Sequence, residues 1–170
     1  MIFIETNSKD ATFHFSVEEY LVQYYPYNEP IIMMWQADRC AMLGCNQIAQ
    51  SEIDIAYAEQ EHIQIVRRSS GGGTIFTDLG TYLYTMIFPY KKEQNTTENI
   101  KEKAIYPIVN TLNQMGVKAQ IEGRNDILID GKKISGFAQY TKHGRICVHG
   151  SLLFDTDLEM LAKVLHVDTE

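Results

Sequence analysis

The stretch that decides the fold is VKAQIEGRNDILIDGKKISGFAQYTKHGRICVHGSLLF, residues 117–154. Two turn signals divide it, Asp130-Gly131 and His143-Gly144, and each lies between runs rich in apolar residues. An Asp-Gly pair between apolar runs is typical of a β-hairpin, because a tight turn needs residues that tolerate positive φ. The stretch therefore predicts successive antiparallel strands. We expect these strands at residues 117–121, 125–129, 132–141 and 145–154.

The sequence outside this stretch adds helices and further strands. Five residues near helical spacing predict a helix over residues 11–25: Phe15, Val17, Tyr20, Leu21 and Tyr24. Other helices are expected at 52–61, capped by Ser51 with Asp54, at 96–115, and from a cap at Asp155 to Leu165. Further strands are expected at 1–5, 31–35, 63–67, 74–77 and 81–88. Since the hairpins require antiparallel pairing, we predict an α+β fold with a mixed, largely antiparallel sheet and flanking helices.

Length and composition limit the classes of protein to consider. The 170 residues fit one domain with its own core, and 45% of them are apolar. Fifteen basic and twenty-two acidic residues give a net charge of −7, which argues against an extended nucleic-acid or anionic-membrane surface. We find no apolar run of about 20 residues, no secretory signal and no disulfide framework among the three cysteines. We therefore expect a cytoplasmic protein with reduced thiols.

The first segment with chemical potential is the glycine-rich run from Arg67 to Thr74. Gly71, Gly72 and Gly73 lack a Cβ, so their backbone N–H groups can approach an anion closely. A neighbouring arginine can bind a phosphate or carboxylate through two parallel hydrogen bonds. The spacing does not match a P-loop or a dinucleotide fingerprint. A plain tight turn with surface arginines is the alternative, and this segment alone favours that alternative.

The second segment surrounds the turn at Asp130-Gly131. With a two-residue loop, residue 126 faces 135 and residue 128 faces 133. Alternation then places Asp126 and Lys133 on one face as diagonal neighbours, with Cα atoms roughly 7–8 Å apart. Lys132 points the opposite way, so at most one of the two lysines enters a site. A longer loop would shift this register, and a surface Asp–Lys pair of little energetic value is the alternative.

Two residues of the last predicted strand lie next to the second segment. His149 could line the same sheet as the strand over residues 132–141. Cys147 lies among apolar residues, where a cysteine is more often a small core residue than a nucleophile.

At these segments the chain resembles the lipoate–protein ligase A family, from Met1 to about Leu165. The family signature R-R-x-S-G-G-G is met by residues 67–73. The R-N-D and G-x-K-[IV]-[SA]-G block is met by residues 124–126 and 131–136, and H-G-[ST]-L-L by residues 149–153. Gly44-Cys45-Asn46-Gln47 looks like the G-x-N-Q turn of the family. Several motifs in the right order are specific and outweigh both alternatives above.

The resemblance implies a biotin/lipoate-ligase type of fold and assigns roles to matching positions. Lys133 matches the lysine that contacts both the lipoyl carboxylate and the adenylate phosphate. Asp126 is a possible ligand of Mg²⁺. The other matching positions of the ATP, adenylate and lipoate pocket are Arg68, Ser70, Gly72, Gly73, Thr74, Ile75, Phe76, Asn125, Asp126 and His149.

The implied activity is a ligase reaction with ATP, Mg²⁺ and lipoate. Lipoate is activated to lipoyl-AMP and then transferred to a lysine of an acceptor protein. The implied acceptors are the lipoyl domains of 2-oxoacid dehydrogenase E2 subunits or the glycine cleavage H protein. Two alternatives remain: an octanoyl- or lipoyltransferase of the same fold with a cysteine nucleophile, and a non-catalytic lipoate-binding fragment.

The chain departs from the family pattern in two respects. Many relatives read H-D-L-G-N after the glycine loop, whereas this chain has Thr77-Asp78-Leu79-Gly80-Thr81. The family's catalytic domain also continues past Glu170. We therefore expect residues 1–170 to be a single catalytic-type domain that is incomplete at its C-terminal end.

Overall fold

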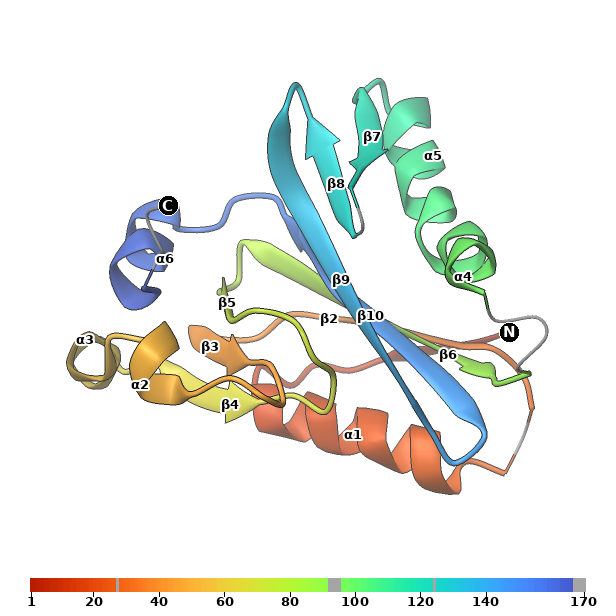
Figure 1. Ribbon diagram of the computed structural model, residues 1–170, viewed down its shortest axis with the longest axis horizontal. Helices are drawn as coiled ribbons and strands as arrows, with labels where there is room; N and C mark the ends of the chain where they lie inside the picture. The colour runs from red at the N-terminus through yellow and green to blue at the C-terminus, as the bar shows by residue number, and fades with distance from the viewer. Residues whose placement is uncertain (27, 92–95, 124, 167–170) are drawn as a thin grey trace.

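The computed structural model describes residues 1–26, 28–91, 96–123 and 125–166. It confirms the predicted α+β class, but the strands form two sheets where one was expected (Figure 1). The larger sheet has the order β1-β2-β6-β10-β9-β8-β7, with β1 and β2 parallel and the other neighbours antiparallel. Its strands are β1 (Ile2–Glu5), β2 (Ile31–Trp35), β6 (Thr81–Pro89), β7 (Ala119–Glu122), β8 (Asp126–Ile129), β9 (Lys132–Lys142) and β10 (Arg145–Leu153).

The smaller sheet has the order β4-β3-β5. Its strands are β3 (Cys40–Leu43), β4 (Gln64–Arg67) and β5 (Ile75–Thr77). The sequence predicted β4 and β5 but missed β3, whose four residues are all buried. Four apolar residues without alternation are consistent with either a buried strand or a helix segment, and only the pairing with β4 and β5 decides between them.

The predicted hairpins form, but one register differs from the prediction. Ile129 pairs with Lys132 and Leu128 with Lys133, as expected for a two-residue loop. A bulge then inserts Ile134, so that Ser135 pairs with Ile127 and Gly136 pairs with Asp126. The predicted pairing of Asp126 with Ser135 is therefore wrong.

The predicted helix over 96–115 is two helices, α4 (Thr97–Ala104) and α5 (Tyr106–Gln114). Pro107 lies at the start of α5, where a residue without a backbone N–H is tolerated, so the chain begins a new helix there. Ile105 separates the two helices, and its side chain is fully buried.

Two predicted caps are also wrong. The predicted helix over 52–61 divides into α2 (Ala49–Glu52) and α3 (Ile55–Gln60), and the cap of α3 is Asp54, which accepts a hydrogen bond from Tyr57 N at 2.9 Å. The last helix, α6 (Leu158–Val164), is capped by Asp157, not Asp155.

Helix α1 (Ala11–Tyr24) forms where predicted, but a different face is buried. Its buried residues are Ala11, His14, Glu18, Leu21 and Val22. Tyr20 and Tyr24, which the prediction placed on the apolar face, are exposed. The buried face of α1 therefore includes two polar side chains, those of His14 and Glu18.

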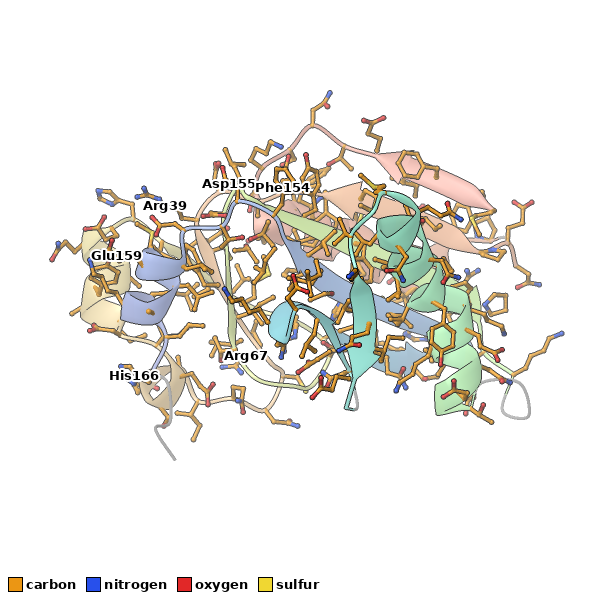
Figure 2. The ribbon with its side chains drawn as sticks, turned by 90° about the horizontal axis from the view of Figure 1, so that it is seen from above. Arg39, Arg67, Phe154, Asp155, Glu159 and His166 are labelled. Carbon is orange, nitrogen blue, oxygen red and sulfur yellow. The ribbon has the colours of Figure 1, made fainter. Side chains whose placement is uncertain are left out.

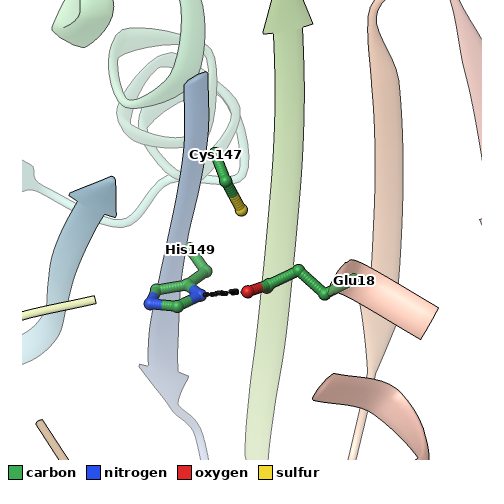
Figure 3. A group of neighbouring side chains, drawn as sticks. All are labelled: Glu18, Cys147 and His149. Carbon is green, nitrogen blue, oxygen red and sulfur yellow. Dashed lines mark hydrogen bonds and ion pairs between the residues drawn. The ribbon is translucent and has the colours of Figure 1, made fainter. Parts of the chain in front are cut away.

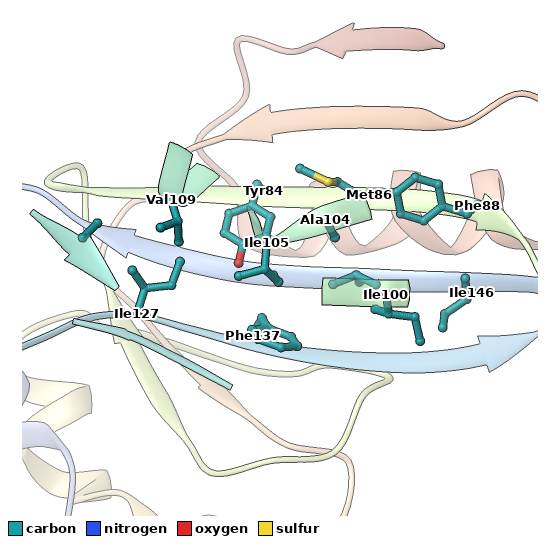
Figure 4. Close-up of a cluster of buried hydrophobic side chains, with 12 residues drawn as sticks. Tyr84, Met86, Phe88, Ile100, Ala104, Ile105, Val109, Ile127, Phe137 and Ile146 are labelled. Atoms are coloured by element: carbon teal, nitrogen blue, oxygen red, sulfur yellow. The ribbon is translucent and has the colours of Figure 1, made fainter. Parts of the chain in front are cut away.

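The larger sheet carries helices on both faces (Figure 1). Residues of α4 and α5 pack with β6, β9 and β10 in the cluster drawn in Figure 4, which includes Tyr84, Ile105, Phe137 and Ile146. Leu21 and Val22 of α1 pack on the opposite face with Ile31, Ile87 and Cys147. The helices α2, α3 and α6 lie beside the smaller sheet. Among the described helices, none is long and apolar enough to cross a membrane.

Candidate functional site

A cavity of about 340 Å³ lies where the two sheets meet. Its walls come from the glycine loop, α1, α6 and strands of both sheets. Nine of the residues singled out in the sequence line it: Arg68, Gly72, Gly73, Thr74, Ile75, Phe76, Asn125, Lys133 and His149. Ser70 and Asp126 do not line it, but each contacts a residue that does. The two motif segments, far apart in sequence, therefore share one site.

One part of the cavity wall is apolar. Phe15, Trp35, Met42 and Leu83 come from α1, β2, β3 and β6. The polar groups Lys133, Asn125 and Arg68 and the glycine backbone also line the cavity. Such a cavity suits a ligand with an apolar chain and an anionic group.

Helix α6 supplies Leu161 and Leu165 to the cavity wall. The segment before α6 is held by the turn between β5 and β6: the backbone N–H groups of Phe154 and Asp155 both donate to Gly80 O, and Asp157 N donates to the Asp78 carboxylate at 2.8 Å. Figure 2 shows Phe154 and Asp155 where the chain leaves β10 for α6. The segment in which this chain departs from the family pattern thus anchors one wall of the cavity.

The glycine loop after β4 is shaped by Arg68. Its guanidinium donates to Ser70 Oγ at 3.1 Å, Met42 O at 2.7 Å, Gly71 O at 3.1 Å and Gly73 O at 2.5 Å. Four of the five N–H groups of a guanidinium are therefore used within the protein. The predicted contact of Arg68 with a nucleotide stays a prediction, and its observed contacts hold the loop.

The turn that begins at Gly44 supports the loop from outside. Arg67 donates to Gly44 O at 2.8 Å and to Gln47 O at 2.6 Å, and Cys45 N donates to Ser70 O at 2.9 Å. A Cβ on Gly44 would overlap the carbonyl group of Gly72. This position therefore requires glycine because two backbone segments meet there.

Lys133 forms an ion pair with Asp126, with Nζ and Oδ1 2.8 Å apart. The pair is partly exposed, at 57% for the Lys133 side chain and 33% for that of Asp126. An ion pair with this exposure contributes little to stability, so Lys133 can exchange Asp126 for another anion at low cost. Lys132 is exposed and does not line the cavity, as the alternation argument predicted.

Asn125 is held at the cavity by the neighbouring strand. Its side-chain amide donates to Phe137 O at 3.0 Å, and Phe137 N donates to Asn125 O at 3.2 Å. Arg124, the first residue of the same motif, lies outside the described residues.

Glu18 was not predicted as a site residue, but it is 2% exposed and contacts His149 (Figure 3). Burial acts to raise the pKa of Glu18, but the His149 ring and hydrogen bonds from His149, Thr85 and Tyr140 hold the pKa below its ordinary value. The sequence signal for its burial was the helical spacing of Ala11, His14, Glu18 and Leu21, which form the buried face of α1.

Cys147 lies beside the Glu18 carboxylate. The Cys147 Sγ, a Glu18 carboxylate oxygen and a His149 ring nitrogen, which are atoms able to bind a metal, lie within 4.8 Å of one another. Cys147 is fully buried, which confirms it as a core residue. Burial and the negative charge of Glu18 raise the pKa of its thiol well above the ordinary value. A protonated thiol is a poor nucleophile and a poor metal ligand.

The chain matches the model of the lipoyl protein ligase A/B catalytic domain over residues 10–170. A probable lipoate-protein ligase A of Mycoplasma pneumoniae is 40% identical over 169 residues, which cover 98% of this chain and 49% of the relative. The chain spans about half the length of the curated relatives it matches.

Three solved structures are similar to the whole described fold. LipL1 of P. falciparum in complex with lipoate has a TM-score of 0.87 at 26% identity, covering 96% of this chain and 51% of that chain. A lipoate-protein ligase A bound with ATP has a TM-score of 0.85 at 27% identity, and the match covers 98% of this chain and 70% of that chain. The bi-partite lipoate protein ligase from Thermoplasma acidophilum, described with its E2 lipoyl domain, has a TM-score of 0.83 at 28% identity. The match covers 99% of this chain and 66% of that chain.

These structures bear out the ligase fold expected from the motifs. Since the family model spans nearly all of its residues, the chain belongs to the lipoyl protein ligase A/B catalytic domain family.

Proposed function

We propose that this chain provides the catalytic part of a lipoate–protein ligase. It activates lipoate with ATP to lipoyl-AMP and transfers the lipoyl group to a lysine of an acceptor protein. The observation that carries the proposal is the cavity that an apolar wall, Lys133 and the glycine loop line together. The lipoate-bound and ATP-bound relatives of the same fold support it.

In the first step the lipoyl carboxylate attacks the α-phosphorus of ATP, and pyrophosphate leaves. Negative charge gathers on the oxygens around that phosphorus. The ammonium group of Lys133 and the backbone N–H groups of the glycine loop stabilise this charge if they are already aimed at it. Lys133 is available for this task because its ion pair with Asp126 is partly exposed and can be exchanged for a phosphate at low cost.

Mg²⁺ would neutralise charge on the departing pyrophosphate. Asp126 is the candidate ligand, since Mg²⁺ in nucleotide sites is commonly bound by one or two carboxylates together with phosphate oxygens. Asp126 keeps a third of its side chain exposed beside the cavity, which fits this role.

In the second step the amine of an acceptor lysine attacks the carbonyl carbon of the mixed anhydride, and AMP leaves. A free lysine has a pKa of about 10.4, so the attacking amine must first lose a proton. The acceptors we propose are lipoyl domains of 2-oxoacid dehydrogenase E2 subunits or the glycine cleavage H protein. The relative described with its E2 lipoyl domain supports the first of these.

Cys147 does not suit the role of nucleophile in an acyltransferase of the same fold. Such an enzyme needs an accessible thiol with a lowered pKa. Cys147 has the opposite properties, because it is buried and its thiol pKa is raised.

The test is lipoate-dependent exchange of labelled pyrophosphate into ATP. We expect exchange that requires both lipoate and this protein. Lipoate binding without any exchange would identify a non-catalytic lipoate-binding protein. Transfer of an acyl group to a lipoyl domain without ATP would identify an acyltransferase instead.

Replacing Gly73 with valine should weaken nucleotide binding about tenfold or more while changing stability little. A Cβ at Gly73 would have no atom within 4 Å, so the fold tolerates it, but the side chain would keep a phosphate away from the backbone. The measurements are ATP affinity by calorimetry and thermal denaturation.

The corresponding change at Gly72 should have a different effect on stability, although the sequence analysis assigned both glycines to anion binding. Its φ is +95°, and a Cβ would lie 3.1 Å from the Arg68 guanidinium. Gly72→Val should therefore lower stability as well as affinity. Unchanged ATP affinity in Gly73→Val would show that the loop does not hold the nucleotide.

A further inference from the structure

Four side chains from three segments, the glycine loop, β10 and α1, form one continuous series of hydrogen bonds beside the cavity. Arg68 Nε lies 3.1 Å from Ser70 Oγ, Ser70 Oγ lies 2.5 Å from His149 Nε2, and His149 Nδ1 lies 2.9 Å from a carboxylate oxygen of Glu18. All four residues are buried. We call this series the Arg68–Glu18 relay.

The direction of each hydrogen bond follows from the ionised carboxylate at its end. Glu18 can only accept, so His149 donates from Nδ1, and in the neutral imidazole Nε2 is then the acceptor for the Ser70 hydroxyl. Ser70 Oγ in turn accepts from Arg68 Nε. Two further hydroxyls, those of Thr85 and Tyr140, donate to Glu18 at 2.9 and 3.2 Å. Each of the three hydrogen bonds of the relay thus joins one donor to one acceptor.

The order Ser70, His149, Glu18 is that of a nucleophilic triad, but its surroundings exclude that use. Ser70 has no exposed surface and does not line the cavity. Its oxygen already accepts a hydrogen bond from a guanidinium, which lowers its nucleophilicity. Ser70 is therefore not a nucleophile, and the hydrogen bonds of the relay orient the residues that they join.

The far end of the relay is the glycine loop. The Nη2 group of Arg68 donates to both Gly71 O and Gly73 O, so the orientation of the guanidinium sets the path of the loop. The near end is α1, where Phe15 lies one turn before Glu18 and lines the cavity. His149, in the middle, lines the cavity too.

We propose that Glu18 is a positioning residue that fixes the glycine loop for nucleotide binding, acting through His149, Ser70 and Arg68. The proposal rests on the proposed function insofar as the loop holds the nucleotide. Its structural content, the control of the loop by a carboxylate on α1, does not depend on catalysis.

The principal variant is Glu18→Gln, which keeps the shape of the side chain and removes its charge. A glutamine oxygen can still accept from His149, but a neutral acceptor forms a weaker bond than a carboxylate. We expect the KM for ATP to rise about ten- to a hundredfold while kcat changes less than threefold. We also expect the amides of Gly71, Gly72 and Gly73 to exchange with deuterium at least about tenfold faster.

Ser70→Ala interrupts the same relay at another link and should produce the same pattern. The matched control is Glu19→Gln, which removes the same charge one residue along α1. Glu19 is exposed and pairs with Lys142, outside the relay. It should leave both the KM for ATP and the loop exchange within about twofold of the unmodified protein.

The outcomes separate this proposal from the proposed function. If loop exchange in Glu18→Gln and Ser70→Ala equals that in Glu19→Gln, the positioning role is wrong, whatever the activity. If the loop exchange rises as expected but the unmodified protein shows no lipoate-dependent pyrophosphate exchange, the positioning role stands and the ligase proposal fails. If Glu18→Gln does not fold, Ser70→Ala alone tests the positioning role. Faster loop exchange than in Glu19→Gln would support the role, and equal exchange would contradict it.

Discussion

Lys133→Ala should lower the rate of lipoyl-AMP formation by about a hundred- to a thousandfold, the range seen when a preorganised charge-stabilising donor is removed. The reason is geometric. Lys133 lines the cavity that is also lined by the glycine loop, and its ammonium group forms an ion pair with Asp126 there. The measurement is lipoate-dependent adenylate formation at saturating ATP, together with the melting temperature.

Lys132→Ala is the matched control. Lys132 precedes Lys133 on β9 and has the same charge, but it is exposed and outside the cavity wall. We expect its activity to stay within about twofold of the unmodified protein, as for most surface substitutions. Equal losses in the two variants, with folding intact, would contradict the assignment of the catalytic lysine.

Gly150→Ala should lower the free energy of unfolding by about 3 kcal/mol, near the upper end of the usual cost of overpacking. Gly150 lies in β10 opposite Tyr84 and Phe137. A Cβ there would overlap the Tyr84 hydroxyl and lie 2.7 Å from the Gly136 carbonyl oxygen. Tyr84 is 2% exposed and cannot move aside easily. The melting temperature should fall by about 6–12 °C.

Gly136→Ala on the adjacent strand β9 is the control for this prediction. A Cβ there would have Lys133 Cε as its nearest neighbour at 3.4 Å, and that flexible side chain can yield. We expect a change in the free energy of unfolding below about 1 kcal/mol. A Gly150→Ala protein as stable as Gly136→Ala would show that Tyr84 has room to move.

The hairpins were predictable because their turns are local. Asp130-Gly131 and His143-Gly144 both adopt the positive φ that the sequence suggested. The bulge at Ile134 was not predictable, since it depends on how β8 and β9 pack rather than on the turn. Strand β3 was missed for a similar reason: its partners lie more than twenty residues away, and its own four residues carry no periodic signal.

The candidate site was predictable where a motif marked it. Lys133 and the glycine loop meet at the cavity as expected, and their catalytic roles stay predictions. Glu18 was missed because a carboxylate within a helix is normally expected on the solvated face. Its burial depends on His149, Thr85 and Tyr140, which the chain supplies only from distant strands.

The position of β10 has a consequence for how the protein folds. Strand β10 lies between β6 and β9, so within the larger sheet it joins the half built from β1, β2 and β6 to the half built from β7, β8 and β9. Pairing of β6 with β10 joins residues such as Tyr84 and Gly150, which are far apart along the chain. Contacts of such long range slow folding, because a large loop must close before they form. During synthesis on the ribosome, the two halves of the sheet can therefore unite only after residues 145–153 have emerged.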